Sequence, residues 1–470
     1  MNNQTTVISQ AELDTQLAYC NKIYDLWRSR GITPTAYVET YGCQQNEADS
    51  EKIRGILCES GYAITDTAEN ADVVVMNTCA IREHAEQRVF GNLGALTHTK
   101  RRHPGQKIFL CGCMAGQTVV TDRIRKSYPH VDGVFSTHHL WQFAEILYRV
   151  LTAGKRVFYI EDEPGSIAEG LPQMRDHTLK AWVSIMYGCN NFCTYCIVPY
   201  VRGRERSRKA ADILAECQML IAAGTKEITL LGQNVNSYGK DLDEGIDFAD
   251  LLLKIAEIPG DFLIRFMTSH PRDASPKLFD AMASSPKIAK QLHLPFQSGS
   301  SRVLKAMNRH YDRETYLKKV LYAKSVMPDL VLTSDVIVGF PGETEEEFEE
   351  TISLIQQVRY DSLFTFIFSP RPGTPAAKMD DPTPKEDKNR RFDKLCAIQN
   401  TISEEIHSGY VGKTFRCLID GTDKEYLTAR TEGGRLVRLQ GDTALIGSFQ
   451  PVTITGSTTW SLTGELAEKE

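Results

Sequence analysis

Short apolar runs alternate with longer amphipathic stretches through most of the chain, and the alternation becomes regular from about residue 35. Up to about residue 151, runs with the length and composition of strands are separated by stretches with helical spacing. Strands are predicted at 35–40, 73–77 and 107–111, and helices at 47–60 and 81–102. Strands that alternate with helices in this way favour a parallel, doubly wound sheet.

Residues 1–33 precede this pattern and are predicted to form a helical extension. Apolar residues at helical spacing predict an amphipathic helix over 11–30, which a glycine then ends. We expect this helix to pack on the domain that follows, which we place at 34–152.

The alternation resumes after a polar connection at 152–180, which is predicted to be a linker or an edge hairpin. Over 175–404 the pattern gives six strand–helix repeats, which fit a partial, open (β/α)6 barrel with its active site at the carboxyl ends of the strands. Those strands are predicted at 181–187, 227–232, 262–267, 291–294, 330–338 and 362–368. The last segment, 405–470, has short alternating runs broken by Gly and Asp, which predict a small all-β barrel. The predicted fold class is therefore α/β, with a small all-β domain at the C-terminus.

Three cysteines follow the first strand of the predicted barrel at CxxxCxxC spacing: Cys189, Cys193 and Cys196. Thiolates hold iron–sulfur clusters, and a cubane has four irons, so three local cysteines leave one iron open. A zinc site would need a fourth Cys or His nearby, and none follows within the usual few residues. The spacing and the strand before it therefore favour a cluster with one open iron. At this point the sequence resembles the radical S-adenosylmethionine (SAM) superfamily.

Each of the three predicted strands of the first domain ends in a turn that carries a cysteine: Cys43, Cys79 and Cys113. The carboxyl ends of strands in an open α/β sheet line one crevice, so these thiols can converge despite their separation in sequence. They are either a second cluster site or buried structural thiols. Cys111 is a competing candidate, but Gly112 permits the tight turn that a ligand loop needs, so we favour Cys113.

The composition restricts these interpretations. The chain has 470 residues, 41% hydrophobic and 24% charged, and its net charge of −6 argues against attraction of nucleic acid by the whole surface. No run has the length of a membrane span, and the polar N-terminus lacks a signal-peptide core. We therefore expect a cytoplasmic protein, in which twelve cysteines favour metal ligation over disulfides. Five cysteines in other contexts are interpreted as small buried apolar residues: Cys20, Cys58, Cys217, Cys396 and Cys417.

Six strings resemble motifs of the methylthiotransferases of the radical SAM superfamily, and the resemblance covers nearly the whole chain from about residue 35. The strings are TYGCQQN at 40–46, MNTCAIRE at 76–83, GCNNFCTYCIVPYVRG at 188–203, LLGQNVNSY at 230–238, LHLPFQSGS at 292–300 and DVIVGFPGET at 335–344. Within this family the resemblance is strongest to the branch that acts on adenosine-37 of tRNA, the 2-methylthio-N6-dimethylallyladenosine synthases. It implies an N-terminal cluster domain, a radical SAM core and a C-terminal TRAM domain.

The resemblance also implies a division of labour between two 4Fe-4S clusters. The cluster on Cys189, Cys193 and Cys196 would bind SAM and, once reduced, cleave it to methionine and a 5′-deoxyadenosyl radical. The cluster on Cys43, Cys79 and Cys113 would hold or supply the sulfur, and a second SAM would give the methyl group. The radical would activate carbon 2 of the adenine, a position that polar acid–base chemistry does not reach. No convincing pair of carboxylates or Ser/His/Asp set is present, and none is needed.

Residues at the predicted strand ends are candidates for SAM binding, each with a purely structural alternative. They are Gln233, Asn234, Ser269, Gln297, Ser298, Asp335 and Gly339. Gln233 and Asn234 either bond the amino group of SAM or cap a strand. His270 and Arg272 either pair with an anionic group or belong to a turn. Asp335 lies among apolar neighbours and needs a partner, such as a ribose hydroxyl or an internal Arg.

Local basic runs are the candidates for RNA contact, and a solvated charged surface is the alternative for each. One run follows the CxxxCxxC motif, a second covers 100–103, and scattered arginines lie in the slightly acidic last segment. The residues concerned are Arg202, Arg204, Arg206, Arg208 and Lys209 after the motif, and Arg416, Arg430 and Arg438 in the last segment.

The implied partners are a tRNA anticodon stem-loop and a low-potential electron donor such as a flavodoxin or ferredoxin, and the protein is expected to be a monomer. The prenyl group of the substrate needs an apolar pocket, for which Phe296, Phe340 and Tyr200 are candidates near strand ends. Two alternatives remain open. One is a sister enzyme that acts on threonylcarbamoyl-adenosine or on an aspartate of a ribosomal protein. The other is a non-catalytic RNA-binding protein with structural clusters.

Overall fold

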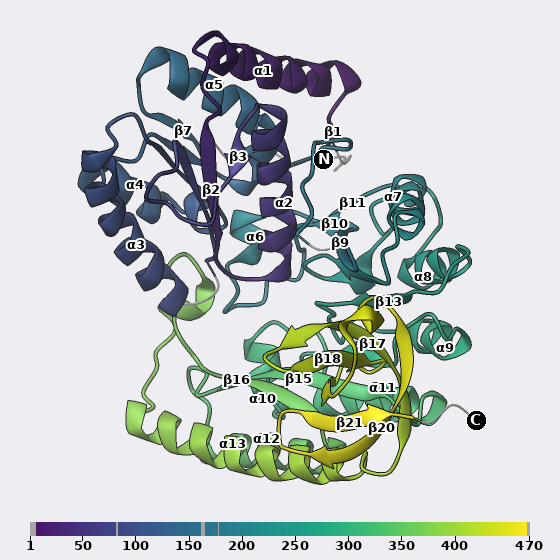
Figure 1. Ribbon diagram of the computed structural model, residues 1–470. Coiled ribbons are helices and arrows are strands. Elements are labelled where there is room, and N and C mark those ends of the chain that lie inside the picture. The colour runs from purple at the N-terminus through teal and green to yellow at the C-terminus, as the bar shows by residue number, and fades with distance from the viewer. Residues whose placement is uncertain (1–5, 81–82, 161–164, 177, 468–470) are drawn as a thin grey trace. The chain divides into compact units, whose positions relative to one another are not determined.

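The computed structural model describes residues 6–80, 83–160, 165–176 and 178–467, which form two compact units (Figure 1). Unit 1 contains the described residues up to Asp176, together with Met186–Asn190 and Cys196–Arg208. Unit 2 contains residues 178–185, Asn191–Tyr195 and the described residues from Lys209 onward. The four predicted domain ranges are a finer division than these two units and stay a prediction.

Unit 1 is built on one six-stranded sheet in the order β3-β2-β4-β5-β6-β7, and every neighbouring pair is parallel. The strands are β2 (Thr35–Thr40), β3 (Ala63–Ile64), β4 (Val73–Thr78), β5 (Lys107–Gly112), β6 (Gly133–Phe135) and β7 (Val157–Tyr159). Three of them coincide with predicted strands to within a residue. The prediction missed β3, β6 and β7, which have only two or three residues each, too few for a periodic pattern.

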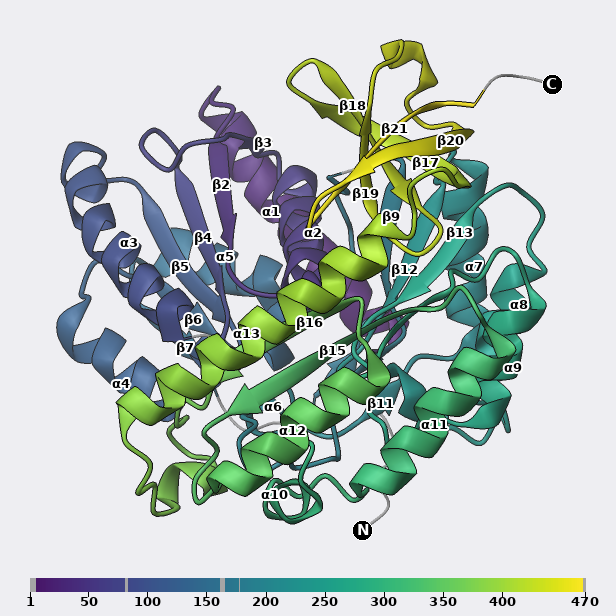
Figure 2. The ribbon, with the colours of Figure 1, turned by 90° about the horizontal axis from the view of Figure 1, so that it is seen from below.

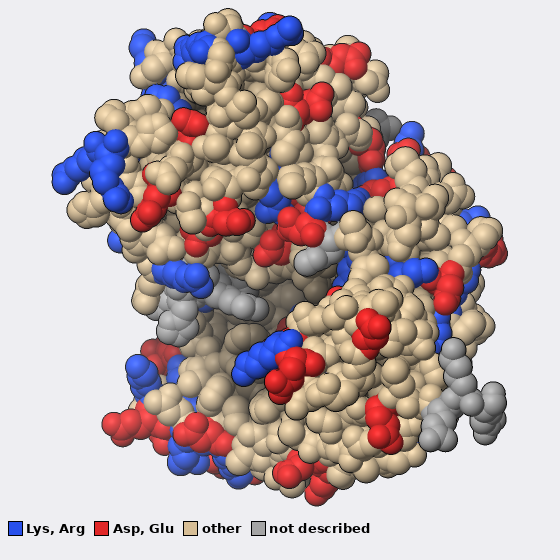
Figure 3. Space-filling view, viewed as in Figure 1, with Lys and Arg blue, Asp and Glu red and all other residues tan. Residues whose placement is uncertain are grey.

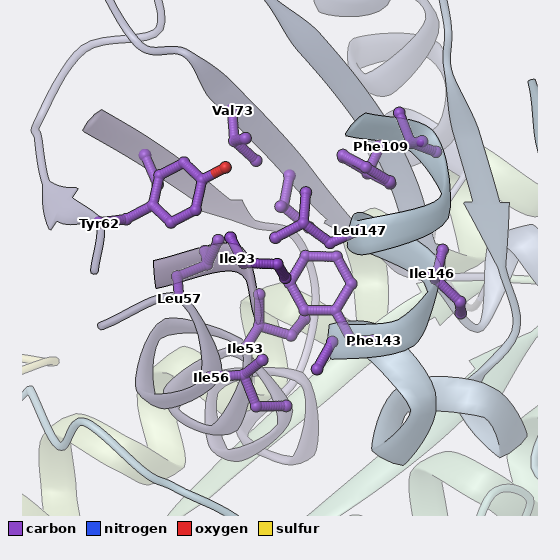
Figure 4. Packing of buried hydrophobic residues seen from close by; sticks show 14 of the residues in the cluster. Ile23, Ile53, Ile56, Leu57, Tyr62, Val73, Phe109, Phe143, Ile146 and Leu147 are labelled. Carbon is purple, nitrogen blue, oxygen red and sulfur yellow. The ribbon is translucent and has the colours of Figure 1, made fainter. Parts of the chain in front are cut away.

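Helices cover both faces of this sheet, as a doubly wound fold requires. On one face α1 (Gln10–Ser29), α2 (Gln44–Glu59) and α5 (Phe143–Ala153) supply the residues of one hydrophobic core. Figure 4 shows Ile23, Ile53 and Phe143 from these helices pointing into that core, together with Val73 and Phe109 from the strands. On the other face, α3 (Glu83–Arg102) and α4 (Thr118–Ser127) enclose a second core.

The N-terminal helix packs on the domain that follows, as predicted. A capping box begins α1, in which Ser9 and Glu12 bond each other's backbone N–H groups. The indole Nε1 of Trp27 donates to the hydroxyl of Tyr62 at 3.0 Å, which fixes the end of the helix. Before the helix, the short strand β1 (Thr6–Val7) pairs with β8 (Ser166–Ile167).

The segment 152–180, predicted to be a linker or an edge hairpin, supplies an edge strand but no hairpin: it contains β7, which pairs in parallel at the edge of the main sheet, and β8, which pairs with β1. The strand β7 is apolar, but it has only three residues, all half buried at the edge of the sheet, so it stands out little from its polar surroundings in the sequence.

Unit 2 contains six parallel strands in two sheets of three, ordered β13-β12-β9 and β14-β15-β16 (Figure 2). The strands are β9 (Lys180–Ser184), β12 (Glu227–Leu231), β13 (Leu263–Phe266), β14 (Gln291–His293), β15 (Val331–Val338) and β16 (Ser362–Ile367). The helices between and after them are α7 (Ala210–Ala222), α8 (Phe248–Ala256), α9 (Pro276–Ser284), α10 (Ser301–Ala306), α11 (Arg313–Val326), α12 (Glu345–Val358) and α13 (Lys385–Ser408). An isolated bridge between Ile264 and Ile288 lies where the two sheets approach each other. The arrangement is a partial (β/α)6 barrel.

The C-terminal part of unit 2 is a closed five-stranded barrel in the order β17-β18-β19-β21-β20. Its strands are β17 (Thr414–Asp423), β18 (Tyr426–Thr431), β19 (Leu436–Leu439), β20 (Phe449–Ser457) and β21 (Leu462–Leu466). Their inward-facing side chains form a separate hydrophobic core. The predicted fold class is thus confirmed in all its parts. Within the described residues, no helix is both long enough and apolar enough to cross a membrane.

Candidate functional site: two cysteine triads and a row of polar strand ends

Cys43, Cys79 and Cys113 come together at the carboxyl ends of β2, β4 and β5, which are neighbours in the sheet. The side-chain oxygen Oδ1 of Asn46 lies 4.0 Å from the Sγ of Cys43 and 3.9 Å from the Sγ of Cys113. Cys79 and Cys43 both interact electrostatically with Cys113. Three turns separated by up to 70 residues therefore present their thiols to one point.

Two glycines allow the turns to approach so closely. Gly42 has φ +116°, and a Cβ on it would lie 2.5 Å from the Cβ and 2.8 Å from the Sγ of Cys79. Gly112 has φ +90°, and a Cβ there would lie 2.4 Å from the Oδ1 of Asn77. Neither position accepts a side chain without displacing a neighbour. The sequence argument for a tight turn before Cys113 is supported by this geometry.

Gly42→Ala is therefore expected to displace Cys79 and to lower the iron content of the reconstituted protein from about eight toward about four per chain. Backbone strain alone would add a destabilisation of about 1–3 kcal/mol. Iron analysis and urea unfolding measure the two effects separately.

The control is Gly224→Ala, since Gly224 also has positive φ, +98°, but nothing lies within 4 Å of its would-be Cβ. Equal iron loss in both variants would contradict the role given to the contact with Cys79.

Asn46 is held in one orientation. Its Nδ2 donates to the carbonyl oxygens of Tyr41 at 2.7 Å and of Thr78 at 2.9 Å. The amide oxygen must therefore face the thiols, where it accepts a hydrogen bond from Nη2 of Arg202 at 2.7 Å. Arg202 was predicted to bind RNA, and sequence reasoning did not connect it with this triad.

Cys111 faces away from the triad. It belongs to the core cluster that also contains Phe109, Phe135 and Phe143. Burial raises the pKa of the Cys111 thiol well above its usual range, with the charges of Asp49 and Cys113 adding to the effect. Cys113 instead packs with Ala80, on the triad side. The strand β5 ends at Gly112, whose positive φ of +90° turns the chain, so Cys113 leaves the strand and faces a different side from Cys111, which supports the choice of Cys113.

The second triad lies on the segment that follows β9. Within unit 1, the backbone N–H of Cys189 donates to the carbonyl of Gly203 at 3.1 Å. The hairpin of β10 (Met186–Tyr187) and β11 (Arg206–Ser207) closes this loop, which also contains the short helix α6 (Val198–Val201). Cys189 and Cys196 thus both lie in a loop whose two ends, near residues 187–189 and 203–206, are hydrogen-bonded to each other.

Within unit 2, the middle of the CxxxCxxC loop is fixed from the segment that follows α10. Asn308 Nδ2 donates to the carbonyl of Phe192 at 3.0 Å, and the N–H of Thr194 donates to the carbonyl of Met307 at 3.0 Å. Phe192 itself has φ +47°, a strained conformation for a bulky residue. The backbone of the loop is thus held in a conformation that the chain would not adopt alone.

Arg309 also lies against the loop. Its side chain is 4% exposed, and its Nη1 lies 3.4 Å from the Sγ of Cys193. Its Nη2 donates to the carbonyl of Pro295 at 2.7 Å, which anchors the guanidinium beside the thiol. Sequence reasoning missed this residue, because it stands more than a hundred positions from the cysteine it touches.

The donors of the first triad are three thiols, which is the chemistry that holds an iron–sulfur cluster. Burial raises the pKa of Cys113 to about 12, although Arg202 opposes the shift. The thiol therefore loses its proton on binding metal, as metal ligands do.

Polar atoms without partners gather at the carboxyl ends of the strands of unit 2. Buried polar groups are normally hydrogen-bonded, so such atoms indicate a missing ligand. Six of these atoms lie at or just after the ends of β12, β13 and β14: Asn234 Oδ1, Asn236 Oδ1 and Nδ2, Ser269 Oγ, His270 Nε2 and Gln297 Oε1. The positive φ of Thr268 (+73°) and Gln297 (+67°) places backbone strain at the same edge. This edge fits a ligand with several hydrogen-bonding groups, as SAM has.

His270 enters this row as a neutral imidazole. Burial, with the charges of Arg309 and Arg272 in support, lowers the pKa of His270 well below its usual range. Its Nδ1 accepts a hydrogen bond from the backbone N–H of Arg272 at 3.2 Å, so Nε2 carries the proton and is a donor.

The other predicted SAM residues lie on the same part of unit 2. Asn234 Nδ2 donates to Asp273 at 2.7 Å, which turns its orphaned oxygen inward. Asp335 has a partner in His293, with 3.5 Å between Oδ2 and Nε2, rather than the internal Arg that the sequence suggested. Gly339 donates its N–H to Glu343 at 2.7 Å. Ser298 accepts the N–H of Ser300 at 3.2 Å and is therefore partly committed to its own turn. Gln233 is half-buried after β12.

The predicted RNA contacts of Arg202 and Arg208 are corrected. Both side chains are buried and paired within unit 1, Arg202 with Asp49 and Arg208 with Glu169. A buried, paired guanidinium cannot reach a phosphate without breaking its ion pair. Arg206 is half-buried and donates to backbone carbonyls, whereas the other two residues of this run, Arg204 and Lys209, are exposed. The remaining predicted contacts, Arg416, Arg430 and Arg438, are half-buried and bonded to carboxylates of unit 2.

The predicted prenyl pocket also needs correction. Phe296 and Phe340 are fully buried and pack on Tyr360 and Phe368, so they are core residues. The structure instead leaves two other aromatic residues exposed on β16: Phe364 at 50% and Phe366 at 43%. Tyr200 is exposed and lies in unit 1.

The remaining cysteines divide into two groups. Cys20, Cys217 and Cys417 are buried, as predicted. Cys58 is exposed and Cys396 is half-buried, so the prediction that they are core residues is wrong. Cys58 lies in the last turn of α2 and Cys396 lies on α13, each on a side of its helix that is not fully buried, which a lone cysteine in a sequence does not reveal.

Three family models match the chain in succession. They are the uncharacterized protein family UPF0004 over residues 35–136, the radical SAM superfamily over 183–355 and the TRAM domain over 409–467. Among curated proteins, the tRNA-2-methylthio-N(6)-dimethylallyladenosine synthase of Acetivibrio thermocellus is 50% identical over 466 residues, which cover 98% of this chain and 97% of the relative. The chain belongs to this family of synthases. A second synthase of the family, from Clostridium perfringens, is 51% identical over 434 residues, or 92% of this chain and 97% of its own length. The family assignment made from the six strings is confirmed.

Solved structures support the fold. The radical SAM methyltransferase TsrM of Kitasatospora setae, solved with cobalamin and a 4Fe-4S cluster, matches with a TM-score of 0.53 over 73% of this chain and 74% of its own. Its sequence identity is 13%, so the likeness concerns the fold alone.

Proposed function

We propose that this protein methylthiolates carbon 2 of N6-dimethylallyladenosine at position 37 of tRNA. The observation that carries the proposal is the identity of about half of all residues, over nearly the full length, to relatives that are named for this reaction. The radical SAM and TRAM models agree with a SAM-dependent enzyme that acts on RNA. The alternatives of a sister branch or a non-catalytic protein are not favoured.

The cofactors are SAM and two 4Fe-4S clusters. When bound, they supply the electron, the radical, the sulfur and the methyl group that polar side chains cannot supply. Cys189, Cys193 and Cys196 would hold one cluster, and Cys43, Cys79 and Cys113 the other. The two sets are supported by the loop spacing and by the convergence of the three strand ends, respectively.

The chain binds and orients SAM through the polar strand ends of unit 2. Asn234, Ser269 and Gln297 each have a buried polar atom without a partner, and a ligand with amino, carboxylate and hydroxyl groups would pair them. Asp335 is a hydroxyl-binding candidate, since its side chain is 28% exposed despite its position inside a strand. Gly339 follows β15 and lets a ring approach the backbone.

Contact with tRNA falls to the exposed basic residues. Arg204 and Lys209 are exposed after the CxxxCxxC segment. At the end of α3, Arg101 and Arg102 are exposed, whereas Lys100 is paired with Asp132. Figure 3 shows blue side chains gathered at the α3 and α4 edge of unit 1. Phosphate contacts by such residues position RNA without reading its sequence.

The target base would lie on the inner face of β16. Leu363 and Thr365 line a cavity with residues of α13, so Phe364 and Phe366, which alternate with them, face the other way. The Phe364 ring meets the His293 ring edge-on at 5.8 Å. One step beyond Phe366, Phe368 packs in a cluster with Tyr195 of the CxxxCxxC loop. An exposed aromatic row that leads to the cysteine loop fits an adenine with an apolar prenyl tail.

Phe364→Ala is expected to raise the KM for the prenylated anticodon stem-loop by roughly 10- to 100-fold, because one stacking contact is worth about 1–3 kcal/mol. SAM cleavage measured without RNA should not change. Leu321→Ala, which removes an exposed apolar residue of α11, is the control. Loss of SAM cleavage in the Phe364 variant would assign this side chain to SAM instead of the RNA.

We place the enzyme in the cytoplasm, where its tRNA substrate is found, and propose a flavodoxin or ferredoxin as the electron donor. It is proposed to act as a monomer.

The experiment that tests the function is a competition under reducing, anaerobic conditions with SAM. Anticodon stem-loops with N6-dimethylallyladenosine, N6-threonylcarbamoyladenosine and plain adenosine are mixed, a ribosomal-protein substrate is added, and the products are identified by mass spectrometry. We expect preferential methylthiolation of the dimethylallyl form. Preferential turnover of another substrate would reject the proposal in favour of a sister branch.

A further inference from the structure

We infer that Arg202 is a positioning residue for the N-terminal cysteine triad, where its guanidinium holds and stabilises the Cys113 thiolate. The inference rests on the proposed assignment of Cys43, Cys79 and Cys113 as cluster ligands. It replaces the RNA contact that the sequence suggested for this residue.

The hydrogen bonds of the Arg202 guanidinium lie within unit 1, and two of the three reach a triad thiol or the asparagine beside the triad. Its Nε donates to the Sγ of Cys113 at 3.0 Å. Its Nη2 donates to Oδ1 of Asn46 at 2.7 Å and to Oδ2 of Asp49 at 2.9 Å. Asn46 is the residue whose oxygen lies within 4 Å of two of the three thiols. The guanidinium therefore contacts one thiol directly and a second through the amide.

Burial of the Arg202 charge costs free energy unless nearby groups stabilise the charge. Arg202 is 4% exposed, and a buried guanidinium loses several kcal/mol of hydration that its partners must replace. One carboxylate, Asp49, neutralises it when the thiols are protonated. Three thiolates with an iron–sulfur cluster bring further negative charge to the same place, which the cation then offsets.

A purely structural ion pair would look different. Arg208, in the same segment, shows what such a pair is: it is buried, and both Nε and Nη2 bond the carboxylate of Glu169, at 2.6 and 2.7 Å. Arg202 gives its carboxylate only one of these two nitrogens and turns Nε toward sulfur. The guanidinium of Arg202 thus bonds both a carboxylate, Asp49, and a proposed cluster ligand, Cys113.

The place of Arg202 in the chain adds a consequence. It stands six residues after Cys196, the last cysteine of the other triad, on a segment that belongs to unit 1. Val201, its neighbour, packs with Cys113 and Ala80. The segment that leaves the CxxxCxxC motif therefore supplies the cation that supports a ligand of the other cluster.

The test isolates the N-terminal cluster. In the full chain with Cys189, Cys193 and Cys196 changed to Ala, the only cluster retained is the one on the N-terminal triad. Arg202→Gln, Arg202→Lys and the control Arg208→Gln are made in this background and reconstituted with iron and sulfide. Two quantities are measured: the midpoint potential, by EPR-monitored titration, and the rate of iron loss to a chelator.

We expect Arg202→Gln to shift the potential to more negative values, because a lost hydrogen bond and a lost cation both favour the oxidised cluster. Iron loss to the chelator should become roughly ten times faster or more. Arg202→Lys should reverse part of this shift in potential, since lysine restores the positive charge but not the several N–H donors of the guanidinium. Arg208→Gln should change neither quantity, although it also removes a buried guanidinium.

Each outcome has one meaning. If the parent background holds no iron, the proposed ligand set is wrong, and the role of Arg202 beside a cluster ligand is rejected with it. If the parent holds iron and Arg202→Gln leaves potential and iron loss unchanged, the ligand set stands and the inference is wrong. If Arg202→Gln does not fold, Arg202→Lys decides: a potential equal to that of the parent would then overturn the inference.

Discussion

Replacement of Cys189, Cys193 and Cys196 together by Ala is expected to abolish 5′-deoxyadenosine formation and to halve the iron content from about eight to about four per chain. The three thiols come from one loop of eight residues, so no other described cysteine can replace them locally. Without them SAM has no iron to bind. The loss of activity should reach the detection limit, because no polar route to carbon 2 exists.

The same variant tests whether the two sites are independent. The N-terminal triad is built from β2, β4 and β5, a parallel sheet with its own cores on both faces, and does not depend on these three side chains. Retention of about four irons with an unchanged far-UV spectrum is therefore expected. Loss of all iron from a folded variant would contradict two independent clusters, and residual SAM cleavage would contradict the ligand assignment.

Most of the fold could be predicted from the sequence, because its strands are long enough to show a pattern. Strands β4, β12 and β15 each have five or more residues, most of them buried, and amphipathic helices follow them in the sequence. The strand β7 within 152–180, a segment predicted to be a linker or an edge hairpin, was missed for the opposite reason. β7 has only three residues, all half-buried. It pairs with β6, which is distant in the sequence, and local composition does not reveal such a pairing.

The cysteine ligands could be predicted because the CxxxCxxC spacing and the strand ends can both be recognised in the sequence. Arg202 and Arg309 could not, although each lies 3.0–3.4 Å from a predicted ligand. A basic run in a sequence is usually a solvated surface, and burial of individual members depends on partners far along the chain, such as Asp49 for Arg202. The exposure of Phe364 and the burial of Phe296 are likewise decided by which side of the strand the neighbouring helix covers.

Single changes of Cys43, Cys79 or Cys113 to Ala should spare reductive SAM cleavage and yet reduce methylthio insertion to background. The first triad is the proposed site of sulfur supply, and two thiolates hold a cubane far less well than three. The iron content should fall to about four per chain, and 5′-deoxyadenosine should still accumulate when reductant and SAM are supplied. Nucleoside mass spectrometry and quantitation of 5′-deoxyadenosine on the same samples separate the two activities.

Cys111→Ala is the matched control, since it stands two residues from Cys113 at the end of the same strand and removes the same thiol. Its side chain packs among Phe109 and Phe135 rather than toward Asn46, so the variant should keep all iron and full insertion. The cost should be a small loss of stability, about 1 kcal/mol, from the space left in the core. If Cys111→Ala loses the cluster while Cys113→Ala keeps it, the turn after β5 presents the other cysteine, and the ligand set must be redrawn around residue 111.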